Sequence, residues 1–138
     1  MKKSVPCLKA LTAEARMAIG GTLCLIPQLP FRVGRESRSE HKHHPSDARR
    51  SSNSIPNNDL YLAETDQVMN VSREHFLIDI RDGGYVIVDK GSTCGTIVEG
   101  ELVGDKGRNA SRILEDNDVI IVGTSRSNFI FKFVLKVS

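Results

Sequence analysis

Three short segments of this chain carry residue types that bind a phosphate group: Gly34-Arg35, Ser72-Arg73, and the run Ser92-Thr93-Cys94-Gly95-Thr96. A phosphate monoester is close to dianionic at pH 7 and offers three strong acceptor oxygens. Guanidinium groups, hydroxyls and backbone N–H groups in turns are the donors that suit it. No catalytic triad or Walker loop accompanies these segments. The residues therefore predict a protein that holds a phosphate without reacting with it, and not an enzyme.

The segments lie where predicted strands begin or end. Residues 76–80 alternate in character as a strand does, Asp82-Gly83-Gly84 is a strong hairpin signal, and residues 85–88 form the returning strand. Because the two ends of a hairpin approach each other, we expect Ser72 and Ser92 to be neighbours. Arg35 follows the short strand 31–33, so it is expected to project at the mouth of a loop.

The rest of the chain after residue 20 also has the pattern of short strands separated by Gly, Asn and Asp turns. This pattern predicts an all-β fold, an antiparallel β-sandwich of about eleven short strands. Further predicted strands cover 22–26, 60–62, 96–98, 102–103, 113–114, 119–122 and 129–137. In the last of these, three phenylalanines share one face.

The length of 138 residues suits one domain. We predict that this domain spans residues 20–138. Residues 1–19 have apolar side chains at roughly helical spacing, which fits a leader or short helix, although an irregular first strand is equally compatible. Residues 37–58 are polar, charged and almost without apolar side chains, which predicts a long flexible insert.

Taken together, the three motifs resemble those of the forkhead-associated (FHA) domain, a phosphothreonine-binding β-sandwich. The family's motifs run Gly-Arg, then Ser-x-x-His, then Ser-x-Asn-Gly-Thr after the central hairpin. This chain has Gly34-Arg35, Ser72-Arg73-Glu74-His75 and Ser92-Thr93-Cys94-Gly95-Thr96 in that order. The resemblance covers about residues 22–135.

The resemblance implies a role for each matched residue. Arg35 and Ser72 would contact the phosphate, Arg73 would add a phosphate or peptide contact, and Thr93 and Cys94 would lie along the peptide. A second group would support the site, with His75 tying the loops together and small or hydroxylated residues shaping them: Gly34, His75, Gly95 and Thr96. Residues that follow the phosphothreonine would be selected by the loops around Asn70 and Glu99.

Cys94 departs from the family pattern, because the family usually has asparagine there. That asparagine hydrogen-bonds the peptide backbone, and a thiol is a weak donor and a weak acceptor. The long insert is a second departure. Two interpretations therefore remain. The first is a module that binds phosphothreonine on a protein phosphorylated by a Ser/Thr kinase, and the kinase is a further candidate partner. The alternative is a phospho-independent FHA-like interaction module with a degenerate peptide site.

Composition narrows the other function classes. Nineteen basic and 17 acidic residues give a net charge of +2. Residues 37–58 carry +2 by themselves, so the rest of the chain is formally neutral and no broad nucleic-acid face is indicated. The basic insert is the one alternative site for nucleic acid that the sequence suggests. The three cysteines form no zinc pattern, and no cofactor is predicted. His41, His43 and His44 are read as part of a solvated basic loop and not as a metal site. No membrane segment or export signal is recognised, which favours a cytoplasmic location.

Overall fold

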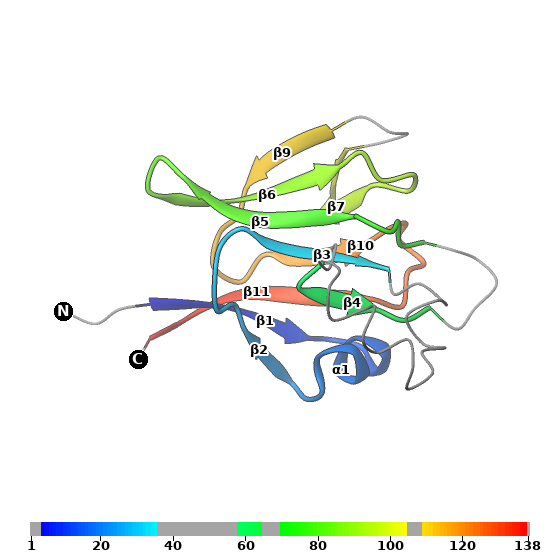
Figure 1. Ribbon diagram of the computed structural model, residues 1–138, viewed down its shortest axis with the longest axis horizontal. Helices are drawn as coiled ribbons and strands as arrows, with labels where there is room; N and C mark the ends of the chain where they lie inside the picture. Colours follow the sequence, from blue (N-terminus) through cyan, green and yellow to red (C-terminus); the bar gives the residue numbers. More distant parts are fainter. Residues whose placement is uncertain (1–3, 36–57, 65–69, 105–108, 138) are drawn as a thin grey trace, which may run out of the picture.

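The computed structural model describes residues 4–35, 58–64, 70–104 and 109–137. Two stacked sheets form the sandwich (Figure 1). One has six strands in the order β2-β1-β11-β10-β7-β8, with bounds Leu23–Leu25, Ser4–Ala10, Ile130–Val137, Val119–Val122, Thr96–Val98 and Glu101–Val103. The other has five strands in the order β4-β3-β5-β6-β9, with bounds Leu60–Leu62, Phe31–Arg35, Phe76–Arg81, Gly84–Lys90 and Asn109–Ile113. The predicted all-β sandwich is confirmed.

The core lies between the two sheets and is formed by alternate residues of facing strands. The three phenylalanines predicted to share a face do so at exposures of 3% or less, and Ile78 pairs with Ile87 across β5 and β6. The alternation does not hold to the strand ends, because Ile80 and Val137 are about half exposed. The largest buried side chains from both sheets are Leu8, Leu62, Phe76, Ile78, Ile87, Ile120, Phe131 and Phe133.

Residues 4–10 form neither a leader nor a helix but a strand, β1, the other alternative that their sequence left open. This strand is the second of the six-stranded sheet and lies between β2 and β11. All seven residues of β1 pair with β11, from Ser4 opposite Val137 to Ala10 opposite Phe131. Leu8 is completely buried. Without β1, β11 would present an unpaired edge, so this segment belongs to the sandwich and the boundary at residue 19 is not a structural one.

A short helix, α1 (Ala13–Ile19), follows β1, so the prediction of a short helix is correct for these residues. Thr12 caps it by accepting a hydrogen bond from the Ala15 N–H at 3.2 Å. Gly20 ends it with a left-handed φ of 73°. The helix contacts β1 and β2 in one sheet and β4 in the other, and Ala15 is completely buried, so α1 closes the open side of the sandwich (Figure 1).

The predicted hairpin between β5 and β6 is present. Asp82 and Gly83 both have positive φ (52° and 79°), the geometry of a two-residue turn whose twist matches the strands. The turn fixes the register that brings Phe76 opposite Asp89. The start of β5 and the end of β6 are thereby held side by side, as the sequence predicted.

Strand β4 is the exception to the antiparallel pattern, because it runs parallel to β3. Two parallel neighbours need a crossover of about a dozen residues or more. The residues between Arg35 and Leu60 make this connection, which gives the long polar segment a topological reason. The predicted insert at 37–58 lies outside the described residues except for Asn58, which is buried. Within the described residues, no helix is long and apolar enough to cross a membrane.

Candidate functional site

The matched motifs meet at one end of the sandwich, the right-hand end in Figure 1. Strands β3 and β6 end there, and strands β5 and β7 begin there. The loops before β5 and between β6 and β7 therefore lie next to the end of β3. We refer to Arg35, Ser72, Arg73, Thr93 and Cys94 as the candidate site.

Arg35 and Ser72 are held together by their backbones. The Arg35 N–H, at the end of β3, donates to the Ser72 carbonyl at 2.9 Å, which attaches the loop before β5 to this strand. The Arg35 Nη1 donates to the Val71 carbonyl oxygen at 3.4 Å. The guanidinium group thus lies beside the segment that carries Ser72.

The Ser72 hydroxyl joins this loop to the loop between β6 and β7. Its Oγ accepts a hydrogen bond from the Thr93 N–H at 3.1 Å. A hydroxyl that accepts in this way still has its own hydrogen to donate. Ser72 therefore keeps a donor available at the junction of the two loops, where Thr93 is exposed.

Gly34 permits the loop that carries Arg73 to pass close to β3. A Cβ on Gly34 would lie 2.0 Å from the Arg73 carbonyl oxygen, which is far inside van der Waals contact. The same carbonyl accepts a hydrogen bond from the Asn58 Nδ2 at 2.7 Å. Asn58 is 3% exposed, so a buried amide fixes the backbone of Arg73 while its side chain faces solvent.

His75 connects the two loops from beneath. Its Nδ1 accepts from the Ser72 N–H at 2.9 Å, and its Nε2 lies 2.7 Å from the Gly95 carbonyl oxygen. The first bond requires an unprotonated Nδ1, so the hydrogen is on Nε2, which donates to Gly95. Burial lowers the pKa of His75, against the opposing effects of the Gly95 carbonyl and of Asp89 and Glu64. The neutral ring thus holds the two loops in position.

Asp89 organises the loop between β6 and β7, a role that the sequence analysis did not assign to it. It is fully buried, and its Oδ1 accepts from the Ser92 N–H at 2.8 Å. Its Oδ2 accepts from the Ser92 hydroxyl at 2.7 Å and the Thr96 hydroxyl at 2.8 Å. The Ser92 Oγ in turn accepts from the Gly95 N–H at 2.9 Å. Every hydrogen bond to this carboxylate comes from the loop or the first residue of β7, so the loop that presents the Thr93 N–H has a fixed shape.

The structure does not place the two predicted specificity residues together. Asn70 lies near Ser72, where its side-chain oxygen accepts from the Thr124 hydroxyl at 2.8 Å and its N–H donates to Glu64 at 3.0 Å. Glu99 lies in the turn after β7, about 10 Å from Thr96 by strand rise. Its carboxylate accepts from the Val119 N–H at 2.7 Å.

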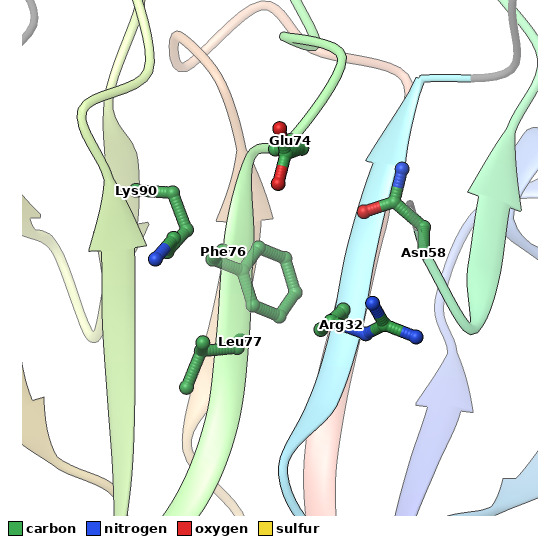
Figure 2. A pocket seen from close by; sticks show the side chains of 6 residues that line it. All are labelled: Arg32, Asn58, Glu74, Phe76, Leu77 and Lys90. Carbon is green, nitrogen blue, oxygen red and sulfur yellow. The ribbon is translucent and has the colours of Figure 1, made fainter. Parts of the chain in front are cut away.

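A small pocket of about 80 Å³ lies beside the candidate site, on the five-stranded sheet (Figure 2). It is lined by Arg32, Asn58, Glu74, Phe76, Leu77 and Lys90. Arg32 is occupied by Asp59, with Nε–Oδ2 and Nη2–Oδ1 distances of 3.2 and 3.3 Å. The pocket contains none of the candidate-site residues.

Three residues that support the site, Asp89, Ser92 and Asn58, were not assigned at the sequence level, and the first two had a weak signal. Asp89 occupies a core-facing position in the alternation Tyr85, Ile87, Asp89, and a carboxylate there needs several donors. Ser92, three residues later, is a typical local partner for it. Asn58 gave no such signal, because it follows a polar stretch. Among the described residues no group of three or more potential metal ligands occurs, and the histidine tract 41–44 lies outside them.

Comparison with known proteins gives the family. The FHA domain model matches residues 31–123, which is more than half of the chain. The chain therefore belongs to the FHA family, a class of phosphopeptide-binding modules that are generally not catalytic. No significant match was found among curated protein sequences.

Solved structures with this fold come from several organisms. The FHA domain of Chlamydia trachomatis CT664 is 25% identical with a TM-score of 0.59, over 95% of this chain and 97% of that one. The kinase-interacting FHA domain of the Arabidopsis kinase-associated protein phosphatase is 20% identical with a TM-score of 0.61, covering 100% and 98%. Mycobacterium tuberculosis EmbR, solved with a low-affinity phosphopeptide, is 22% identical with a TM-score of 0.60. In that case the match spans 98% of this chain but 25% of EmbR.

Proposed function

We propose that this chain binds phosphothreonine peptides through Arg35 and Ser72 and thereby recruits a protein that a Ser/Thr kinase has phosphorylated. The observation that carries the proposal is the junction at Ser72. There the backbone bond to Arg35 and the hydroxyl bond to the Thr93 N–H join three segments at one point. The Arg35 guanidinium and the Ser72 hydroxyl are donors of the kind that the acceptor oxygens of a phosphate require.

Each residue has a distinct role in this proposal. The Arg35 guanidinium supplies the positive charge, and the Ser72 hydroxyl donates a hydrogen bond whose direction Thr93 fixes. Arg73, exposed on the same loop, adds charge at the rim. Asp89 and His75 hold the loops without touching the ligand. Preference for threonine over serine would come from one buried methyl group, worth roughly 0.8 kcal/mol, or about fourfold in affinity.

Two family relatives are consistent with the proposed phosphopeptide binding. EmbR was solved with a phosphopeptide, and the Arabidopsis domain is described as kinase-interacting. The alternative is a phospho-independent interaction module. It is favoured by Cys94, which stands where the family usually has an asparagine that bonds the peptide backbone.

The experiment that tests the proposal measures fluorescence anisotropy with three degenerate peptide pools, carrying phosphothreonine, phosphoserine or unphosphorylated threonine. We expect binding to the phosphothreonine pool, weaker binding to phosphoserine, and loss of both in Arg35→Ala. Arg81→Ala is the matched control, because Arg81 is exposed at the hairpin end of the sheet. Equal binding to all pools, or no effect of Arg35→Ala, would favour the phospho-independent module.

A further inference from the structure

The outer face of the six-stranded sheet is more apolar than a solvated sheet face usually is. Residues that pair across neighbouring strands lie on the same face, so the strand register identifies the side chains that point away from the core. We call this set the outer face: Val5, Cys7, Lys9, Leu23, Leu25, Ile97, Leu102, Val119, Ile121, Ile130, Lys132, Val134 and Lys136. An antiparallel sheet with one wet face normally alternates apolar inside and polar outside.

Solvent reaches the large side chains at the two edges of this face. Leu25 and Leu102 are each 55% exposed, and Leu23 is 39% exposed. Between these edge strands, Ile97, Ile121 and Ile130 are half-buried, and Cys7 is completely buried. Among the described elements, α1 is the one outside the sheets, and its contacts with β4 place it at the open side of the sandwich and not over this face (Figure 1). An apolar patch of this kind on a folded domain marks an interaction surface.

The charge of the outer face has one sign. All its charged members are lysines, and Lys9 and Lys132 are direct register partners. None of the outer-face residues in these six strands is acidic. A partner for this face therefore needs apolar side chains and carboxylates.

The outer face also begins at the candidate site. Leu102, Ile97, Ile121 and Ile130 are successive register partners and form an apolar row across four strands. A Cβ on Gly95 would lie 2.6 Å from the Leu102 Cδ1, so the end of this row contacts the loop that presents the Thr93 N–H. The row spans roughly 14 Å at about 4.8 Å per strand. A chain leaving the phosphate can reach it without a gap.

A second copy of this chain fits the face poorly. In a twofold contact the same patch meets itself, so lysines would face lysines. A segment whose carboxylates pair with these lysines therefore suits the face better than a second copy does.

We propose that the outer face is a second docking surface for the phosphorylated partner protein. The phosphothreonine of that partner occupies the candidate site, and an apolar, carboxylate-bearing segment of the same partner binds the outer face. This inference rests on the proposed function for its first contact. The two contacts would act together, because attachment of the phosphothreonine raises the local concentration of the second segment to the millimolar range.

The test uses the full chain and phosphothreonine peptides drawn from the pool. Each peptide is joined through a Gly-Ser linker, on either side, to a segment of alternating Leu and Glu or of alternating Leu and Lys. We expect the Leu/Glu extension to tighten binding about tenfold on one side and the Leu/Lys extension to add nothing. Ile121→Ala and Lys132→Glu should remove the gain and leave binding of the short peptide unchanged. Ile113→Ala and Arg81→Glu, exposed positions on the other sheet, are the matched controls.

A gain that persists in Ile121→Ala and Lys132→Glu, or one that Leu/Lys matches, would overturn the proposal. A second measurement does not depend on the phosphate. Amide chemical shifts of the unmodified protein are followed while the Leu/Glu segment alone is added, and we expect changes at Ile97, Ile121 and Lys132. Absence of changes there overturns the second surface. Failure of the short phosphothreonine peptide to bind refutes the proposed function instead, so the two failures are distinguishable.

Discussion

Removal of the Ser72 hydroxyl tests the reasoning about the site most directly, because this group has one bond in the structure and a second, separable one in the proposed function. Its Oγ accepts from the Thr93 N–H at 3.1 Å, and the proposal assigns its hydrogen to the phosphate. In Ser72→Ala, water can replace the first bond because Thr93 is exposed, so we expect the free energy of unfolding to fall by only about 0.5–1 kcal/mol. The second bond is charge-assisted and worth about 1.5–3 kcal/mol. Its loss should weaken phosphothreonine binding roughly ten- to hundredfold.

The two effects are measured separately, by urea unfolding and by fluorescence anisotropy with the phosphothreonine pool. Ser72→Thr keeps a hydroxyl and should bind within about threefold of the native protein. Ser111→Ala, at an exposed position of β9, controls for loss of a surface hydroxyl. If Ser72→Ala binds as tightly as Ser111→Ala while folding normally, Ser72 does not contact the phosphate and the reasoning fails.

Four further predictions concern residues around the site. Gly34→Ala should lower the free energy of unfolding by about 3 kcal/mol in urea, because the new methyl group would meet a carbonyl oxygen at 2.0 Å; Gly21→Ala, with no atom within 4 Å, is its control, and equal effects of the two would contradict the packing argument. Thr96→Val removes one hydrogen bond to a buried carboxylate and should cost about 1.5–3 kcal/mol by the same measurement, whereas an unchanged midpoint would mean that the bond adds nothing. Cys94→Asn should tighten phosphopeptide binding about two- to tenfold in anisotropy, with Cys94→Ser as the control, and unchanged affinity would show that the peptide takes another path. Because the pKa of His75 is lowered by burial, the unfolded chain binds more protons than the folded protein below about pH 6.5; stability should be full above that pH and decline as the pH falls, and a urea midpoint with the same pH dependence in native protein and His75→Gln would refute this.

Much of the fold could be predicted because turns and strands depend on patterns of a few neighbouring residues. The hairpin between β5 and β6 requires positive φ at two consecutive residues, and Asp82-Gly83 supplies it. Alternation identified strands such as β5 and β11. The three motifs could be ordered along the chain, and the hairpin alone placed the Ser72 and Ser92 segments together.

The pairing of residues 4–10 with β11 could not be predicted in the same way. The apolar spacing of this short segment is compatible with a helix or a strand, and the choice depends on β11, whose residues are more than a hundred positions away. The parallel pairing of β4 with β3 is likewise a property of the sheet and not of either strand. Long-range pairing of this kind depends on burial in the folded state, which a local pattern does not contain.

The sequence by itself determined most of the strands, the turns, and the residues proposed to bind the phosphate, because these depend on side-chain chemistry and backbone preference over a few residues. Only the tertiary structure decided that Asp89 is a buried acceptor of hydrogen bonds from the Ser92–Thr96 segment, and that Asn58 fixes the backbone of Arg73. It also decided that apolar residues from six strands form one outer face with its charge supplied by lysines. Such features arise where segments distant in sequence meet, and their energies depend on the distances and the burial that folding creates.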